Sequence, residues 1–334
     1  MHEGRLVAGK YRIAQHIAAG SMGEVYDAVH VGIGRHVALK AMPRALVSSA
    51  ELRARFKREV RTAGMLESEY IVQVLDAGVD DELGPYLVTE LLVGEDLEAR
   101  LARERRLDVP AAAAIGYEVA RGLAKAHATG VIHRDLKPSN IFLADRDGGA
   151  TVAKILDFGV SKRRSIDDVA AEPEEEDDYA TAAGVTLGTP DYMSPEQAQG
   201  RQDLDGRSDV WSLAATLYEA LSGKPPHSGG SPFVVMTRIV HEDARPLGAV
   251  APWVPSALCK VVQRGLARYR DERTPDAASF AEAIALAVPD ALWALRMPSP
   301  PKAEPCEEAP PSSANARVQF FRRGAMGRPV AVRT

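Results

Sequence analysis

The first part of the chain carries the pattern of short β-strands. Five runs are rich in β-branched residues and are separated by Gly-rich turns: KYRIAQHI, EVYDAVHV, HVALKAM, YIVQVLDAGV and YLVTELL. One helix is predicted among them, because Phe56, Ala63 and Leu66 recur at helical spacing. Ser48 with Glu51 forms a capping box at its start. We therefore expect a small, mostly β half with a single helix.

From about residue 97 the hydrophobic positions follow the helical period instead. Asp108 and Pro110 start one predicted helix and Gly130 ends it. Another helix is predicted from about Asp209 to Leu221, where Gly223 and a proline stop it. The order of elements predicts an α+β fold of two lobes, a small β-rich lobe with one key helix and a larger α-helical lobe.

Two segments are predicted to be unstructured. The stretch 172–178, EPEEEDD, places six acids in seven residues, which repel one another and favour solvent. From about Arg296 the chain is rich in Pro, Ser and Glu, with little apolar surface to bury. Its last stretch, ARVQFFRRGAMGRPVAVRT, has five arginines and no acid. A solvated tail is the simpler interpretation, and docking to an acidic partner is the alternative.

Charge and cysteine content narrow the class of protein. The chain of 334 residues has a net charge of −5 and a pI of about 6.0, which does not indicate a nucleic-acid binder. Its two cysteines have no zinc-site spacing and do not form a disulfide framework, which fits a reducing compartment. We find no signal peptide and no membrane-length apolar run, so a cytoplasmic protein is expected.

The stretch IAAGSMGEVY (17–26) raises three possibilities for a nucleotide site. A dinucleotide fold needs its glycines between a strand and a helix, with an acid about 20 residues on. Here the glycines lie between two strand-like runs, and Lys40 follows at that distance. A Walker loop needs Gly-Lys-Ser/Thr, which is missing. A β-turn-β flap over phosphates remains, although Gly-Ser-x-Gly is also an ordinary turn.

Charged residues on apolar segments suggest the chemistry. Lys40 lies in the apolar run VALKAM, and Glu59 shares the helix stripe of Phe56, so each needs a partner. We expect them to pair, the alternative being two unrelated solvated side chains. VIHRDLKPSNIFL (131–143) then brings acid and amide side chains into one loop, and Asp157 ends a later apolar strand. Such oxygen ligands suit Mg²⁺ and phosphate.

Taken in order, these motifs resemble the eukaryotic-type (Hanks) protein kinases, most closely the bacterial serine/threonine kinases, over roughly residues 9 to 288. The motifs that carry the resemblance are GSMGEVY, VALK, Glu59, HRDLKPSN, DFG, GTPDYMSPE, DVWSL and Arg273. The resemblance implies an extension at 1–8, a kinase N-lobe at 9–92, a C-lobe at 93–288 with an activation segment at 157–196, and a Pro/Ser/Arg-rich disordered tail at 289–334.

The resemblance also implies roles in ATP- and Mg²⁺-dependent phosphoryl transfer, with Mn²⁺ as the alternative metal. Lys40, paired with Glu59, would hold the α- and β-phosphates, and Asp135 would accept the proton of the substrate hydroxyl. Lys137 would neutralise the γ-phosphate, while Asn140 and Asp157 would bind the metal. The nucleotide would be enclosed by Ile17, Gly20, Gly23, Val25, Ala38, the backbone of Glu90 to Leu92, Asp96 at the ribose, Phe142, and Thr89 as a small gatekeeper.

Specificity and control follow from the same resemblance. LKPSN and GTPDYMSPE indicate the serine/threonine branch, with Thr189 shaping the acceptor site. Glu196 would pair with a buried Arg273, and Asp209 would anchor the HRD turn or act as a simple N-cap. Arg134, with Arg55 and Lys162, would form a cationic pocket for a phosphothreonine, and autophosphorylation at Thr181 or Thr186 would fill it. The acids of 172–178 would compete for that pocket, or have no role.

The substitution at Ala18, where the family places a glycine, leaves rival functions open. In a left-handed backbone alanine would cost about 1–2 kcal/mol, roughly tenfold in nucleotide affinity, whereas an extended backbone would cost little. The main alternative is a pseudokinase scaffold, and a small-molecule phosphotransferase is another. Intact Lys40, Asp135 and Asp157 argue against the first, and the GTPDYMSPEQ segment against the second. The protein substrate is not identified by the sequence.

Overall fold

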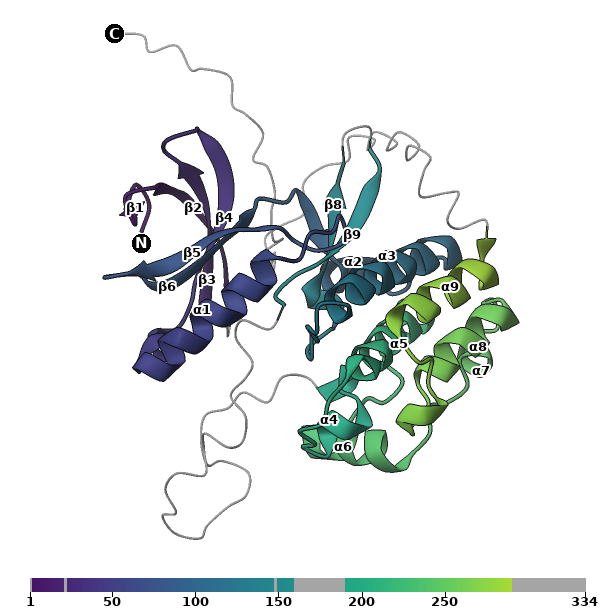
Figure 1. The fold of residues 1–334 in the computed structure, drawn as a ribbon. Helices are drawn as coiled ribbons and strands as arrows, with labels where there is room; N and C mark the ends of the chain where they lie inside the picture. Colours follow the sequence, from purple (N-terminus) through teal and green to yellow (C-terminus); the bar gives the residue numbers. More distant parts are fainter. Residues whose placement is uncertain (1, 21–22, 147–148, 159–189, 290–334) are drawn as a thin grey trace, which may run out of the picture.

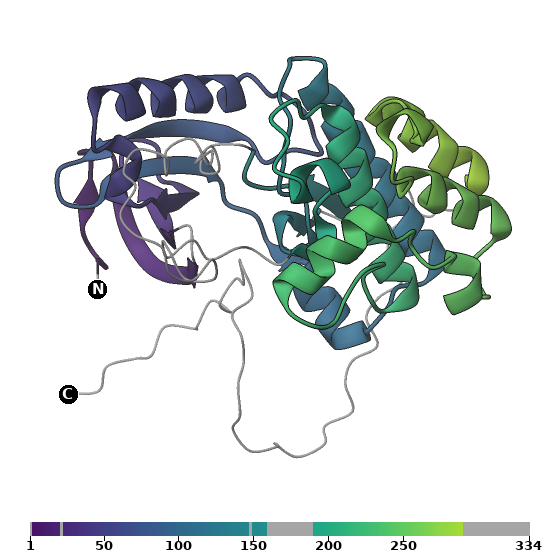
Figure 2. The same cartoon turned by 90° about the horizontal axis from the view of Figure 1, so that it is seen from below.

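The computed structural model describes residues 2–20, 23–146, 149–158 and 190–289. A β-sheet with one long helix forms one end of the molecule, and a bundle of helices forms the other (Figure 1). The view from below separates the same two lobes (Figure 2). The two-lobed α+β architecture predicted from the hydrophobic pattern is therefore confirmed.

The N-terminal lobe is built on a six-stranded antiparallel sheet in the order β1-β2-β3-β4-β6-β5. Alternation of residue types along these strands places Ile13, Tyr26, Leu39 and Val88 in one buried cluster. The strands are β1 (Leu6–Val7), β2 (Tyr11–Gly20), β3 (Gly23–His30), β4 (Arg35–Ala41), β5 (Val74–Asp80) and β6 (Gly84–Glu90).

One long helix, α1 (Ala50–Gly64), covers the sheet after the short 3-10 helix η1 (Arg44–Val47). Phe56 and Ala63 are its buried residues and pack with Met42 and Leu87. Ser49, not Ser48, is the N-cap and accepts the N–H of Leu52. The prediction of Ser48 was wrong because η1 occupies the preceding residues and Ser48 closes that turn instead.

The C-terminal lobe combines a small sheet with a set of helices. Its three strands, in the order β7-β8-β9, are β7 (Gly94–Asp96), β8 (Ile141–Asp145) and β9 (Thr151–Ile155). Its described helices are α2 (Leu97–Glu104), α3 (Val109–His127), η2 (Pro138–Asn140), η4 (Pro190–Tyr192), α4 (Pro195–Ala198), α5 (Gly206–Ser222), α6 (Pro232–His241), α7 (Leu247–Val250), α8 (Ser256–Gly265), η5 (Arg270–Glu272) and α9 (Ala277–Ala287).

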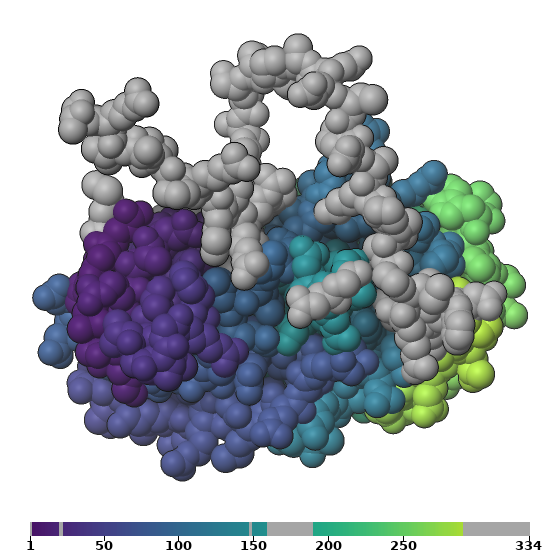
Figure 3. Space-filling view, turned by 90° about the horizontal axis from the view of Figure 1, so that it is seen from above, coloured from purple at the N-terminus to yellow at the C-terminus, as the bar shows by residue number. Residues whose placement is uncertain are grey.

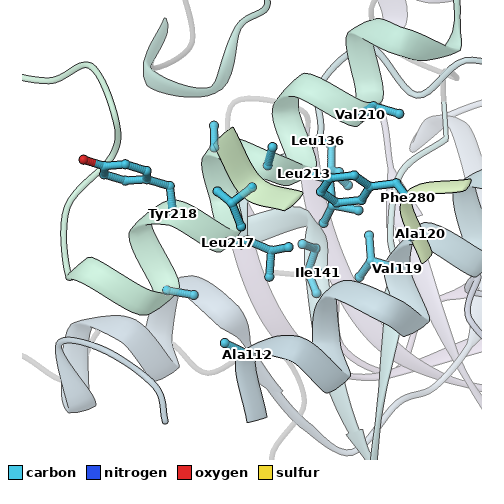
Figure 4. Close-up of a cluster of buried hydrophobic side chains, with 14 of the residues drawn as sticks. Ala112, Val119, Ala120, Leu136, Ile141, Val210, Leu213, Leu217, Tyr218 and Phe280 are labelled. Carbon is cyan, nitrogen blue, oxygen red and sulfur yellow. The ribbon is translucent and has the colours of Figure 1, made fainter. Parts of the chain in front are cut away.

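Helices α3, α5 and α9 pack around the core of this lobe. Asp108 caps α3 by accepting the N–H of Ala111 at 2.7 Å, as its sequence predicts. Helix α5 ends at Gly223, whose φ of 86° is the left-handed form that glycine favours. Val119, Leu213, Leu217 and Phe280 converge from three helices (Figure 4). This apolar packing joins α5 to α3 and α9.

The chain between these ends forms the middle of the molecule. In the space-filling view the N-terminal strands lie at one end, the last helices lie at the other, and residues of intermediate number lie between them (Figure 3). No helix among the described residues is long and apolar enough to cross a membrane.

Candidate active site

A pocket opens between the two lobes and brings residues distant in sequence together. Strands β3, β4 and β6 supply one wall, and the chain that follows β9 supplies the other. The residues that line it are Val25, Ala38, Lys40, Val72, Leu87, Thr89, Leu92, Leu156 and Asp157. An apolar cavity that ends in one ammonium and one carboxylate can receive a flat apolar ring with an anionic chain.

Lys40 and Asp157 form an ion pair across this pocket. The Nζ of Lys40 lies 2.8 Å from the Oδ2 of Asp157. Burial by itself would raise the pKa of Asp157, but Lys40, His133 and Lys137 hold it below its ordinary value. Asp157 therefore stays ionised and is held with a φ of 55°, a conformation that few non-glycine residues adopt.

The expected pair between Lys40 and Glu59 is not formed in this structure. Glu59 instead accepts from the Nε of Arg55 at 3.1 Å, one turn earlier on α1. This i,i+4 contact is available within the helix, whereas Lys40 pairs with the half-buried carboxylate of Asp157. Arg55 therefore has a carboxylate partner within α1, and its place in the cationic pocket with Arg134 stays a prediction. Lys162, the third residue of that pocket, lies outside the described residues.

The loop between α3 and β8 gathers the other charged residues. Asn140 Nδ2 donates to the backbone oxygen of Asp135 at 2.7 Å and to its Oδ2 at 3.2 Å. Lys137 Nζ lies 3.5 Å from the same Oδ2. The loop is joined to the Asp157 segment, because His133 Nε2 contacts the oxygen of Leu156 at 2.8 Å. The loop that carries Asp135, Lys137 and Asn140 therefore lies next to Leu156 and Asp157, which line the pocket.

Asp209, in the first turn of α5, holds the backbone of this loop in place. Its side chain is fully buried, and its two oxygens accept the backbone N–H groups of His133 at 2.8 Å and Arg134 at 2.9 Å. Burial alone would raise its pKa, yet the contact with His127 and the bonds to the loop hold it below its ordinary value. The predicted anchoring role is confirmed, and the N-cap of α5 is Asp205.

The acceptor-side helix α4 is fixed by a second buried ion pair. Arg273 donates through Nη1 and Nη2 to the two oxygens of Glu196, both at 2.7 Å. Ser208 Oγ donates to Glu196 Oε1 at 2.6 Å. Burial would raise the pKa of Glu196, but Arg273 lowers it below its ordinary value. The predicted Glu196–Arg273 pair is confirmed; Thr181, Thr186 and Thr189 lie outside the described residues, as do the acids of 172–178.

The predicted nucleotide residues fall into two groups. Val25, Ala38 and Leu92 line the pocket, as does Thr89. Ile17 and Phe142 are not among the lining residues, but they pack in the cluster that contains Val25 and Ala38.

Asp96 and Glu90 have side-chain partners outside the pocket. Asp96 is buried and caps α2, accepting the N–H of Ala99 at 2.7 Å. It is not among the lining residues of the pocket, and its predicted contact with the ribose stays a prediction. Glu90 pairs with Lys154 at 2.7 Å. Burial raises the pKa of Asp96 above its ordinary value, which reflects its enclosed position.

The structure shows which positions of the glycine stretch require a glycine. Ala18 pairs with Val25 within the β2–β3 ladder, is buried, and is not among the described residues with positive φ. Gly23 has a φ of 118°, and a Cβ there would lie 1.8 Å from the oxygen of Ala41. Glycine is therefore required at 23 and not at 18. Gly20 ends β2, and residues 21–22 between the two glycines lie outside the description.

Three lining residues were missed by sequence reasoning. Val72, Leu87 and Leu156 complete the pocket. Leu156 immediately precedes Asp157, and Val72 and Leu87 lie in two of the strand-like runs. The hydrophobic pattern identified these runs as strands but did not specify which side of each strand faces the pocket.

Asn140 and Asp157 have the chemistry to hold a magnesium ion. The described residues contain no cluster of three or more His, Cys, Asp or Glu side chains suited to a metal. Mg²⁺, however, is commonly bound by one or two protein oxygens together with phosphates and waters. Because Asn140 Nδ2 donates to Asp135, its Oδ1 is the atom left to face a cation. The donor set therefore fits Mg²⁺ bound jointly with a phosphate chain.

Comparison with known proteins places these features in a wider group. A family model described as protein kinase domain matches residues 11–263. Serine/threonine-protein kinase Pkn1 of Myxococcus xanthus is 33% identical over 322 residues, covering 96% of this chain and 44% of Pkn1. Serine/threonine-protein kinase PknA of Mycobacterium tuberculosis is 35% identical over 324 residues, covering 94% of this chain and 70% of PknA.

A solved structure supports the same grouping. A crystal structure of the Mycobacterium tuberculosis PknI kinase domain, a double mutant, has a TM-score of 0.66 and 28% identity, and the match covers 86% of this chain and 98% of that one. The chain spans less than half the length of Pkn1, so the likeness concerns one part of that relative.

Proposed function

Because this chain belongs to the protein kinase family, with its bacterial serine/threonine kinases as relatives, we propose that it transfers the γ-phosphate of ATP to serine or threonine hydroxyls of proteins. The observation that carries the proposal is the meeting of Lys40 and Asp157 at 2.8 Å in an apolar pocket, next to the loop that carries Asp135. We further propose that the whole protein has this activity, acts on protein substrates and works in the cytoplasm.

The reaction requires few changes in bonding. The substrate hydroxyl oxygen forms a bond to the γ-phosphorus, the bond from that phosphorus to the β,γ-bridging oxygen breaks, and ADP leaves. The hydroxyl proton passes to the carboxylate of Asp135, which Asn140 orients through two hydrogen bonds. Lys137, 3.5 Å from that carboxylate, offers its positive charge to the transferring phosphoryl group.

Lys40 and Asp157 change partners when nucleotide enters. Asn140 and Asp157 are the residues that would hold Mg²⁺, which when bound neutralises phosphate charge. Lys40 then exchanges the Asp157 carboxylate for the α- and β-phosphates, so the ammonium keeps an anionic partner throughout. The pair present in this structure therefore keeps two half-buried charges satisfied until the phosphates replace one of them.

Control by autophosphorylation remains part of the proposal. Thr181 and Thr186 are the proposed sites, because a phosphate there would lie in the same chain segment as Asp157 and Glu196 and would be attracted by Arg134. Mass spectrometry after incubation with Mg-ATP, with neither threonine modified, would contradict this part without affecting the transfer reaction itself.

Transfer of radiolabelled phosphate is the direct test of the function. Wild-type protein incubated with γ-labelled ATP and Mg²⁺ should label itself or an added general protein substrate, and EDTA should abolish labelling. Lys40→Met should reduce labelling about 100-fold or more. Nucleotide binding without labelling in the wild type would instead support the pseudokinase alternative, in which the pocket binds nucleotide without turnover.

A further inference from the structure

The peptide group that leads into Asp135 is held at both ends. Arg134 has a φ of 65°, a left-handed conformation that costs a non-glycine residue about 1–2 kcal/mol. Its N–H donates to Asp209 Oδ1 at 2.9 Å, and its carbonyl oxygen accepts from Gln197 Nε2 at 2.7 Å. Because that carbonyl is bonded to the nitrogen of Asp135, Gln197 fixes the peptide plane from which Asp135 projects.

Gln197 reaches this carbonyl from a rigid support. It lies on α4, and its Oε1 accepts from the backbone N–H and the hydroxyl of Ser194, both at 3.0 Å. Ser194 Oγ in turn accepts the N–H of Gln197 at 3.4 Å, which completes a capping box. With donors on Oε1, the Nε2 side of the amide must face Arg134, so the orientation of the side chain is set.

Two further hydrogen bonds hold the backbone of Asp135. The backbone N–H of Asp135 donates to His133 Nδ1 at 3.3 Å, and its carbonyl accepts from Asn140 at 2.7 Å. These bonds come from the same loop, as Asp135 itself does. Gln197 instead lies on α4, which follows the chain segment 157–196. Its bond to the Arg134 oxygen therefore ties this peptide to a different element.

We infer that Gln197 is a positioning residue for phosphoryl transfer, which couples the placement of α4 to the orientation of Asp135. The inference rests on the proposed kinase function. When α4 is in place, the amide holds the strained Arg134 peptide and aims the Asp135 carboxylate at the acceptor hydroxyl. When α4 moves, the carbonyl loses its donor, and Asp135 loses its alignment while every catalytic side chain is still present. A misplacement of about 1 Å is enough to cost roughly 100-fold in rate.

Gln197→Glu tests the bond with a near-isosteric change. One carboxylate oxygen can keep both Ser194 bonds, but the other then faces the Arg134 oxygen without a proton and repels it. We expect kcat for phosphate transfer to fall about 10- to 100-fold while the KM for ATP stays within twofold. Because a protonated carboxyl can donate to the carbonyl, the ratio of variant to wild-type kcat should rise as the pH is lowered from 8 to 5.5.

Gln199→Glu is the matched control, because this residue is exposed and lies two positions further along the same turn. It should leave kcat within twofold of the wild type and give a ratio that does not depend on pH. If circular dichroism shows that Gln197→Glu is unfolded, Gln197→Met replaces it, and the same loss of kcat is expected without pH dependence.

The outcomes separate the two proposals. A wild type that binds ATP but transfers no phosphate overturns the proposed function and this inference with it. An active wild type with a Gln197→Glu variant of unchanged kcat overturns the inference alone. A loss that appears in the KM for ATP, or a kcat ratio for Gln197→Glu that stays flat with pH, also contradicts it, because a merely structural role for α4 would give those results.

Discussion

At the scale of single residues, the buried carboxyl of Glu118 shows how the fold affects a charge outside the active site. Helix α3 places Glu118 at 7% exposure, where it accepts the N–H of Ala153 at 2.7 Å. Burial raises the pKa of Glu118 from 4.5 to about 7, and the bond from Ala153 offsets only part of that effect. The charge of this residue is therefore sensitive to pH near neutrality.

Glu118→Gln should make the protein more stable at alkaline pH. Between pH 4.5 and about 7 the folded state holds a proton that the unfolded state releases, so the stability of the wild type falls as pH rises through that window. The variant lacks this loss and should gain up to about 3 kcal/mol at pH 8 and little at pH 5. Urea unfolding at both pH values measures the difference, with the exposed Glu282→Gln as control. A gain that is equal at both pH values would contradict the account.

The two positions of the glycine stretch should respond in opposite ways to substitution. Gly23→Ala places a Cβ against the Ala41 oxygen at a positive φ, so the β2–β3 turn must shift and the Kd for ATP should rise about tenfold or more. Ala18→Gly restores the residue expected from the family but removes a buried methyl from an extended strand, so the Kd should change less than twofold. Nucleotide titration by calorimetry measures both. An improvement of tenfold in Ala18→Gly would show that alanine weakens the site.

At the scale of elements, the helices were predicted better than their side-chain partners. Asp108 caps the start of α3 and Gly223 caps the end of α5. Both caps depend on local backbone chemistry, so they can be predicted from the sequence. The N-cap of α1 is Ser49 and not the predicted Ser48. Two adjacent serines look equivalent in the sequence, and only the preceding turn η1 distinguishes them. The partner of Lys40 could not be predicted from helix periodicity, since it depends on how closely α1 approaches β4.

The buried pair that braces α4 should be important for stability. The Arg273 side chain is fully buried. In Arg273→Met the buried Glu196 carboxylate would keep the hydrogen bond from the Ser208 hydroxyl but lose both bonds from the guanidinium. Removing one member of a buried ion pair typically costs about 3–5 kcal/mol, and we expect a loss of that size in chemical unfolding at pH 7.

Acidic pH gives a second test of the same pair. Because the pKa of Glu196 is lowered in the folded state, its stabilising contribution is complete above about 4.5 and is lost as pH falls below that value. The difference in stability between the wild type and Arg273→Met should therefore narrow under acid conditions. A loss below 1 kcal/mol at pH 7 would indicate that water replaces the guanidinium at little cost.

At the scale of the whole molecule, the active site exists because two lobes of different construction meet. The order of motifs in the sequence indicated both lobes, and the structure brings Lys40 and Asp157 together in one pocket, next to the loop that carries Asp135. What the sequence could not provide was the distance between the lobes. Asp96 illustrates a second limit, because its side chain caps α2 and this use depends on the local backbone.

Phosphate transfer by Asp135→Asn tests the central claim most directly, since this variant keeps the shape of the side chain and removes its capacity to accept a proton. Parallel assays should measure nucleotide binding and transfer of labelled γ-phosphate to protein in the presence of Mg²⁺. The account predicts binding within a few-fold of the wild type and a loss of transfer of about 100-fold or more. Transfer by Asp135→Asn at the wild-type rate would contradict it, because proton acceptance in this cleft would then belong to another group.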